Sequence, residues 1–383
     1  MDFSLTDEQR MLQDTVERLV ADQYGFEERR GYMKHPQGFD PAIWGQMAEL
    51  GLLGVPFSEE VGGFGGGAVE TMLVMEAFGK GLVLEPYVAS VLTAGALIAD
   101  AGSDAQKSEI LEALVGGELR LAFAHTEADN RYSETLVSTG AEKQGGGYAL
   151  TGEKVAVLHG DSADKLVITA RTAGEADDAQ GLSVFLVDAD AKGVTVTGYP
   201  TNDGLRAANV KLDGVQVGAD ALIGEEGQTA ELIRLTLDRG AFAVCAEAVG
   251  AMSKACDITL EYIKQRKQFG VPIGTFQSIQ HRMVEMRIAL EQARSATMKA
   301  AARLQDGTAE ERRKAVSAAK VQVGEGGQFV AEWGVQLHGG IGMTEEYNLP
   351  HYAKRLVMID HQFGDVDHHL NRFSAMMDMP ESA

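Results

Sequence analysis

Features that mark several large classes of proteins are scarce in this chain. Its 383 residues include only two cysteines, Cys245 and Cys256. A disulfide framework is therefore excluded, and a reducing cytoplasm is the expected setting. No run of about 18 apolar residues occurs, so we expect no membrane-spanning helix. The opening residues Met1–Leu5 have neither a basic flank nor an apolar segment, so we expect no secretory signal.

Basic residues are also in deficit. The 34 lysines and arginines face 56 aspartates and glutamates, which gives a net charge of −22. This balance counts against nucleic acid as a partner, because phosphate binding needs a basic face. An anionic cofactor must then be held by local donors rather than by the field of the whole protein. The apolar fraction of 45% and the charged fraction of 23% are those of an ordinary globular protein.

Helical patterns mark residues 1–118. Thr6 is followed three residues later by Gln9, as in a capping box, and the apolar residues between Met11 and Val20 then share one face. The same period returns in two later segments, Trp44–Leu53 and Val69–Phe78. Between these two lies the glycine-rich run Val61–Gly67. It lacks the Gly-Lys-Ser/Thr ending of a phosphate-binding loop, so a plain connector is the favoured interpretation.

Residues 119–226 have a different pattern, with short β-type runs between Gly and Asp clusters. The runs are Leu119–His125, Tyr148–Leu150, Leu166–Ala170, Ser183–Val187 and Val194–Val196. In residues 227–383 helical periods return in three long segments and a shorter one, which predict an antiparallel four-helix bundle. The long segments are Glu231–Lys264, Phe276–Leu304 and Glu311–Leu337. The predicted fold is mainly α, with a helical N-terminal domain, a central β domain and the C-terminal bundle.

Three groups of residues stand out against this order of domains. The first is Arg266–Gly270, followed by Pro272–Gly274 and Phe276-Gln277, and the second is Gln336–Glu345. A third, weaker group comprises Thr126-Glu127, Leu150–Lys154, Ala163-Asp164 and Ala170–Thr172. In this order and spacing they resemble the acyl-CoA dehydrogenase family, over essentially the whole chain. The resemblance implies that family's fold, with a β-barrel-like middle domain.

The first two groups have the chemistry of a dinucleotide clamp. Arg266 supplies a fixed fork of donors for a pyrophosphate, and Phe269 offers an apolar wall for an adenine or its ribose. Gly339 and Gly340 let a phosphate approach the backbone closely, as a side chain would not. The alternative is a helix end and a glycine turn that only pack the bundle.

The resemblance implies FAD as the cofactor, with its adenosine diphosphate half held across a subunit interface. The residues implied to contact it are Arg266, Gln268, Phe269, Phe276, Gln277, Gln336, Leu337, His338, Gly339 and Gly340, with Thr126 on the flavin side. The implied reaction is α,β-desaturation of an acyl-CoA thioester in fatty acid or steroid catabolism. A carboxylate removes the α-proton, FAD takes the β-hydride, and an electron-transfer protein is the acceptor.

The chain departs from the family on the flavin-ring side. After Thr126-Glu127 the family loop of Pro-Gly-Ala-Gly-Ser-Asp type is replaced by Ala128–Ser133, and a second ring-contacting stretch reads Val157–His159. Phe363 falls where most members carry the catalytic Glu. A minority place that Glu on the first bundle helix, where Gly240 stands here.

Asp365 is the acid nearest to the usual base position, and we predict that it is the catalytic base. Asp367, Asp238 and Glu247 are the alternatives; Glu247 is two helical turns from Gly240, on the same face. Each acid also has a plain structural interpretation: Asp365 as a turn residue, Asp238 as a solvated partner of Arg239, and Glu247 as a buried structural acid.

A cluster of acids and histidines near the C-terminus raises the alternative of a metal-dependent hydrolase. It comprises Asp360, His361, Asp365, Asp367, His368 and His369. Adjacent His368 and His369 point in different directions from a helix or a strand, and the usual His-x-x-x-His spacing is missing, so we predict no metal site.

The pattern Phe-Gly-Asp followed by His-His-Leu resembles the small-subunit type near the pimeloyl-CoA and steroid side-chain dehydrogenases. Such chains pair with a second, related subunit. We therefore expect a heterotetramer, with a homotetramer as the ordinary arrangement if the chain is self-sufficient. A catalytically silent subunit that completes its partner's FAD site is the competing hypothesis.

Overall fold

The computed structural model describes residues 5–377, which form two compact units. The first contains residues 5–29, 67–83 and 241–377, and the second contains residues 30–66 and 84–240. Each unit combines segments that lie far apart in the sequence. The two units therefore do not correspond one to one with the three domains expected at residues 1–118, 119–226 and 227–383, and that division stays a prediction.

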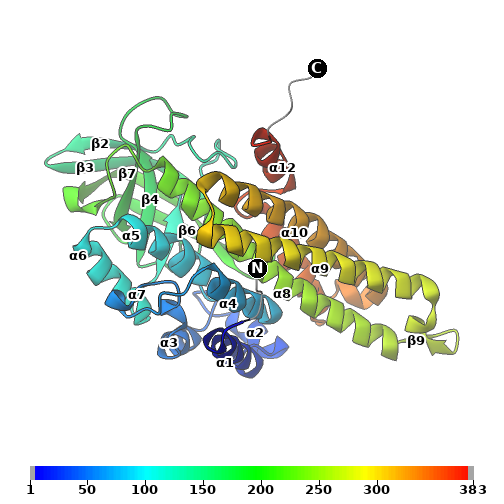
Figure 1. The fold of residues 1–383 in the computed structure, drawn as a ribbon. Helices are drawn as coiled ribbons and strands as arrows, with labels where there is room; N and C mark the ends of the chain where they lie inside the picture. The colour runs from blue at the N-terminus through cyan, green and yellow to red at the C-terminus, as the bar shows by residue number, and fades with distance from the viewer. Residues whose placement is uncertain (1–4, 378–383) are drawn as a thin grey trace, which may run out of the picture. The chain divides into compact units, whose positions relative to one another are not determined.

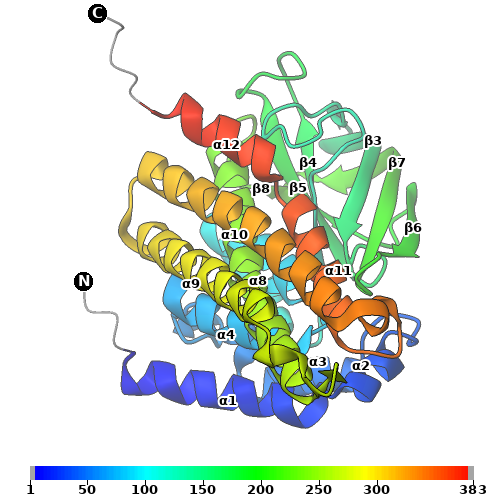
Figure 2. The same ribbon diagram turned by 90° about the vertical axis from the view of Figure 1, so that its right-hand side faces the viewer.

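Long helices dominate the first unit, and α8, α9 and α10 lie side by side in both views (Figures 1 and 2). Its helices are α1 (Asp7–Gln23), α4 (Ala68–Gly81), α8 (Ala230–Gln265), α9 (Gln277–Asp306), α10 (Ala309–His338), α11 (Leu349–His361) and α12 (Val366–Ala375). Helix α8 begins in the second unit and belongs to the first from Ala241 onward. Between α8 and α9 stands a two-stranded hairpin, β9 (Lys267–Gln268) and β10 (Val271–Pro272).

Capping residues fix the helix starts. The Thr6 hydroxyl accepts from the Gln9 N–H at 3.2 Å and the Gln9 side chain accepts from the Thr6 N–H at 2.9 Å, which confirms the predicted capping box. The same reciprocal pair, Thr308 and Glu311, starts α10. Trp44–Leu53 is only partly α-helical: α3 (Pro41–Glu49) ends before Gly51, whose φ of +75° leaves the right-handed helix.

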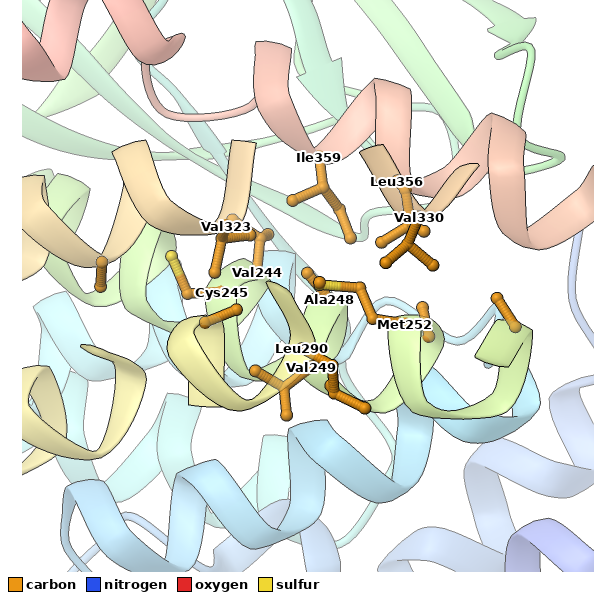
Figure 3. Close-up of a cluster of buried hydrophobic side chains, with 14 of the residues drawn as sticks. Val244, Cys245, Ala248, Val249, Met252, Leu290, Val323, Val330, Leu356 and Ile359 are labelled. Atoms are coloured by element: carbon orange, nitrogen blue, oxygen red, sulfur yellow. The ribbon is translucent and has the colours of Figure 1, made fainter. Parts of the chain in front are cut away.

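The core of the first unit includes buried side chains from α8, α9, α10 and α11, several of which are drawn in Figure 3. Helix α8 contributes a run of small and medium side chains, and α9, α10 and α11 each face it with aliphatic residues. The side chains labelled there are Val244, Cys245, Ala248, Val249, Met252, Leu290, Val323, Val330, Leu356 and Ile359. Burial of this apolar surface at about 25 cal/mol per Å² is what holds the predicted bundle together.

The second unit contains an eight-stranded sheet in the order β6-β7-β3-β2-β4-β5-β8, with β1 pairing parallel to β4. The strands are β1 (Leu121–Ala124), β2 (Gly140–Gln144), β3 (Gly147–Leu158), β4 (Lys165–Arg171), β5 (Leu182–Asp188), β6 (Val194–Pro200), β7 (Arg206–Gly218) and β8 (Leu222–Ile223). Five of them contain or overlap the predicted β-type runs. Strands β2, β7 and β8 were not predicted, because the first two are rich in Gly and charged residues and β8 is very short.

Short helices complete the second unit. They are α2 (Phe26–Tyr32), which starts in the first unit, α3, α5 (Ala96–Ala101), α6 (Asp104–Gln106) and α7 (Glu112–Val115), with π-helical turns at Val88–Gly95 and Lys107–Leu111. The glycine-rich run Val61–Gly67 lies between a 3₁₀ turn and α4, as expected for a connector. Across residues 5–377, no helix is long and apolar enough to cross a membrane.

Candidate functional site

One end of the helical bundle gathers the two segments predicted to bind the adenosine half of FAD. The first is the β9–β10 hairpin, which lies beyond the end of α8 (Figure 1). The second is the end of α10 with the 3₁₀ turn Gly339–Met343. Tyr262 joins them: its hydroxyl donates to the carbonyl of His338 at 3.2 Å, and the two rings stack with centroids 4.2 Å apart. Two segments far apart in the sequence thus form one surface, which we call the bundle-end surface.

The bundle-end surface is largely exposed. Phe269, at the tip of the hairpin with φ +54°, is 92% exposed, and its ring centroid lies 6.2 Å from that of Phe276. The exposed predicted residues are Arg266, Gln268, Phe269, Phe276, Gln277, Gln336, Gly339 and Gly340; Leu337 packs against the core and His338 is buried. An aromatic ring almost wholly in water adds little to its own fold. The surface is therefore suited to contact another molecule.

His338 adds a directed polar group beneath this surface. Its Nδ1 donates to the carbonyl of Gly334 at 2.8 Å, since a carbonyl only accepts. Its Nε2 is then an acceptor; it is buried and finds no hydrogen-bond partner among the described residues. Burial lowers the pKa of His338, although the hydrogen bond to Gly334 opposes the shift, so the ring is neutral at pH 7. A donor from another molecule would satisfy this acceptor.

The turn between α11 and α12 holds the predicted catalytic position. Phe363 is partly buried and packs against the bundle core. Its backbone is left-handed, with φ +57°, and Gly364 follows with φ +104°. The ring at this position therefore serves packing and offers no carboxylate.

Asp365 is half-buried at the start of α12 and acts as the helix N-cap. Its Oδ1 accepts from the backbone N–H of His368 at 2.8 Å. Asp365 therefore has the structural role that its interpretation as a turn residue predicts. Asp367, the next acid, is exposed.

The two other acids considered as bases are both buried. Glu247 receives the guanidinium of Arg355 on both oxygens at 2.6 Å, which confirms it as a buried structural acid. Asp238 is 0% exposed, so the interpretation as a solvated partner of Arg239 is wrong. Arg239 instead pairs with Asp100.

In the second unit, the loop after β1 is held by a buried carboxylate whose role was not predicted. Glu127 accepts from the N–H groups of Ser138 and Thr139 at 2.7 and 3.0 Å, and from the Thr139 hydroxyl at 2.6 Å. Lys154, fully buried on β3, donates to the same carboxylate at 2.7 Å and to the Thr169 hydroxyl at 3.1 Å. The sequence signal is weak, because Lys154 follows Thr151 and Glu153 in the same strand and nothing in the sequence marks it as buried.

Histidine 125 extends this network. Its Nε2 donates to the carbonyl of Ser133 at 3.2 Å, so Nδ1 accepts from the Thr169 hydroxyl at 3.1 Å. Burial, with the charge of Lys154, lowers the pKa of His125 to about 4, so the ring is neutral at pH 7. The loop that begins at Thr126, where the family grips the flavin ring, is therefore closed onto its own strands. Thr126 itself is partly buried, and its carbonyl accepts from the N–H of Val155 at 2.8 Å.

Replacing Glu127 by Gln should destabilise the protein by about 1–3 kcal/mol at pH 7, because Lys154 loses its counter-charge. Burial raises the pKa of Glu127, but Lys154 and the hydrogen bonds outweigh it and lower the pKa to about 2 from 4.5. The stabilisation is thus present above pH 4.5 and is lost as the pH falls through about 2. Urea unfolding at several pH values measures it.

The control for that experiment is Glu226→Gln. Glu226 pairs with Lys143 at 2.8 Å on the surface, where screening leaves little net interaction. It should leave the unfolding midpoint unchanged. An equal loss in both variants would contradict a special role for the buried pair.

The C-terminal histidines do not converge on a metal position. His369 is buried, with Nε2 2.9 Å from the Phe363 carbonyl and Nδ1 3.2 Å from the Ser317 hydroxyl. Both ring nitrogens thus have protein partners. Within residues 5–377 no group of three His, Cys, Asp or Glu side chains is arranged to hold a metal ion. This segment gives the hydrolase alternative no support.

Comparison with known families accounts for almost the whole chain. Sequence models match at residues 6–118 for the acyl-CoA dehydrogenase N-terminal domain, at 122–215 for the middle domain, and at 230–369 for the C-terminal domain. The chain belongs to the acyl-CoA dehydrogenase family. It is therefore an oxidoreductase that acts on CH–CH groups, with that family's three-domain fold.

Individual relatives and solved structures align over nearly their full length. The "Probable acyl-CoA dehydrogenase YngJ" of Bacillus subtilis is 31% identical over 354 residues, which cover 91% of this chain and 92% of the relative. The ChsE4-ChsE5 complex from Mycobacterium tuberculosis aligns at a TM-score of 0.89 and 27% identity, over 99% of this chain and 100% of that one. An FAD complex of PigA aligns at 0.90 and 25%, over 98% of each.

FAD is the cofactor of this family, and the bundle-end surface has donors that fit it. Arg266 offers a planar fork for a pyrophosphate, and a Cβ on Gly339 or Gly340 would meet no other atom within 4 Å, so the backbone there is open to a phosphate. The Nε2 of His338 can accept a hydrogen bond, and the hydroxyl and amino groups of an adenosine can donate one. When bound, FAD takes the hydride equivalent from the substrate β-carbon.

Proposed function

We propose that this acyl-CoA dehydrogenase chain is one of two different subunits of a heterotetramer. In this proposal its bundle-end surface holds the adenosine diphosphate half of a FAD whose flavin ring binds to the partner subunit. The similar ChsE4-ChsE5 structure is a complex, which is consistent with such an assembly. The substrate is an acyl-CoA thioester from fatty acid or steroid catabolism, and an electron-transfer protein accepts the electrons.

The contrast between the two parts of the site carries this proposal. The bundle-end surface has the family's residues, most of them exposed. The ring-side loop after Thr126 lacks the family's glycines and is held by Glu127. Phe363 packs into the core at the usual base position. A homomeric enzyme would join a complete adenosine-binding surface to an altered ring-binding loop at every site, whereas a related partner can supply an unaltered loop.

A separate proposal concerns the case in which this chain is itself catalytic: Asp365 then removes the substrate α-proton. It is half-buried and lies two residues after the usual Glu position, and one of its oxygens caps α12. The capping bond also favours a second candidate function, a silent subunit in which Asp365 only starts α12. Replacement of Asp365, treated in the Discussion, separates the two.

The reduced cysteines support a cytoplasmic setting, which we also propose. Cys245 and Cys256 are free and buried, and burial raises the pKa of both thiols to about 12. Both thiols are thus kept protonated, and neither has the reactivity of a redox site.

Phe269→Ala tests the proposed surface. The ring is 92% exposed, so its removal should leave the fold intact. FAD retention by the assembled enzyme should fall at least about tenfold, because a ring buried against a ligand or partner contributes about 1.5–3 kcal/mol. Flavin absorbance after gel filtration measures this loss.

Phe64→Ala is the matched control, since Phe64 is also exposed, at 66%, but lies far from the bundle-end surface in sequence and in a different unit. It should retain FAD as the parent protein does. Equal retention in the two variants would remove Phe269 from the proposed contact.

A further inference from the structure

The turn at residues 362–365 places Phe363 in a backbone conformation that its side chain does not favour. Phe363 has φ +57°, a region in which a bulky L-residue is an outlier and which costs on the order of 1–3 kcal/mol unless neighbours impose it. Gly364 has φ +104°, and a Cβ there would lie 2.6 Å from a carbon of His368 and 2.7 Å from Nε2 of His369. The surrounding residues must therefore hold this turn in place.

Lys320, on α10, is the main group that holds it. Its side chain is 0% exposed, and its Nζ donates to the carbonyls of Ile359, Asp360 and Gln362 at 2.7, 3.2 and 2.9 Å. An ammonium has three N–H donors, so all are satisfied. These carbonyls end α11, where the helix dipole favours a cation. Burial lowers the pKa of Lys320 to about 8, so it is still mainly protonated at pH 7.

His369, on α12, holds the next carbonyl of the turn. Its Nε2 lies 2.9 Å from the carbonyl of Phe363 and must carry the proton, because a carbonyl only accepts. The Ser317 hydroxyl then donates to Nδ1 at 3.2 Å and fixes the ring. Burial lowers the pKa of His369 to about 2, which keeps this tautomer neutral.

One face of α10 is shaped for this turn. Ser317, Lys320 and Gly324 lie at i, i+3 and i+7, so they share that face. A Cβ on Gly324 would lie 2.5 Å from Oδ1 of Asp360 and 2.5 Å from a methyl of Val366. On this face, the Ser317 hydroxyl and the Lys320 ammonium make hydrogen bonds to α12 and α11. Gly324 leaves the space that Asp360 and Val366 occupy.

We propose that Lys320 and His369 are positioning residues that hold the turn 362–365 in the geometry in which Asp365 takes the substrate proton. This inference rests on the proposed function of Asp365. Hydrogen bonds at the carbonyls of Asp360, Gln362 and Phe363 hold the chain just before Asp365, whose own oxygen caps α12. The carboxylate is thereby fixed from both sides of the turn.

Lys320→Met in the assembled enzyme tests the proposal. Met keeps the length and apolar stem of the side chain but leaves three carbonyls without a donor. We expect kcat to fall between about ten- and a hundredfold, because a small displacement of a reacting group has this effect. KM should change less than about twofold and FAD content should not change, since neither rests on this turn.

Val323→Ala is the control for lost stability. Val323 lies on the same helix, three residues on, and its side chain is in the core shown in Figure 3. It should lower the unfolding midpoint but retain kcat within about twofold. If Lys320→Met retains kcat, or if Val323→Ala loses as much, the positioning role is overturned and Asp365 is untouched.

Two further variants make the outcome decisive. His369→Phe keeps a buried ring but removes the bonds to the Phe363 carbonyl and to the Ser317 hydroxyl. It serves as the test if Lys320→Met fails to fold: kcat should fall at least about threefold, and unchanged kcat would overturn the proposal. Asp365→Asn tests the base itself. If that variant keeps full activity, both the proposed base and its positioning residues are rejected.

Discussion

Asp365→Asn should lower kcat of the assembled enzyme between about 10²- and 10⁴-fold, the usual contribution of a general base. The amide keeps the size of the side chain and an oxygen that still accepts from the His368 N–H, so α12 keeps its cap. The substitution replaces the basic carboxylate by an amide, which cannot take the substrate proton. FAD content and the unfolding midpoint should stay as in the parent protein.

Asp367→Asn is the matched control, because Asp367 is the neighbouring acid and is exposed. It should keep the parent kcat. Steady-state assays of both variants, with flavin absorbance as a check on assembly, give the answer. Full activity in Asp365→Asn would favour the silent-subunit alternative, with the base on the partner chain.

Arg266→Ala should weaken FAD binding at least about a hundredfold. A guanidinium makes two parallel, charge-assisted hydrogen bonds to a pyrophosphate, each contributing about 1.5–3 kcal/mol, and alanine leaves the anionic oxygens without them. The side chain is exposed next to the β9–β10 hairpin, so its loss should not disturb the bundle. FAD titration of the assembled apoenzyme measures the change.

The control is Lys264→Ala, which removes a cation two residues away. Lys264 is exposed and pairs with Glu261 at 2.7 Å on the surface of α8. Lys264→Ala should leave FAD affinity unchanged, because we attribute the effect of Arg266→Ala to lost hydrogen bonds and not to a general loss of positive charge. Equal weakening in both variants, or none in Arg266→Ala, would reject the pyrophosphate contact.

The sequence predicted those parts of the molecule that depend on neighbours along the chain. The capping box at Thr6, the long apolar periods of α8, α9 and α10, and the predicted β-type runs all follow from local spacing. Strand β2, which reads Gly-Ala-Glu-Lys-Gln, has no apolar alternation; it forms because β3 and β4 offer their edges. Such a strand is specified by its partners and not by its own residues.

The same distinction divides the candidate site. The adenosine-side residues are contiguous in two short segments, so the sequence predicts them as groups. Around the turn, hydrogen bonds join Ser317 and Lys320 on α10 to residues on α11 and α12. The loop after β1 likewise depends on Lys154 from β3. A lysine or a serine in a helix pattern does not disclose which distant carbonyl or ring it contacts.

The central claim is that this chain lends an adenosine-binding surface to a partner of a different kind. Native mass spectrometry of the assembled enzyme, combined with flavin quantitation, tests it most directly. We predict a mass equal to two copies of this 41.0 kDa chain plus two copies of a related chain, with fewer FAD molecules than chains. A stable homotetramer of this chain with one FAD per chain would contradict the account.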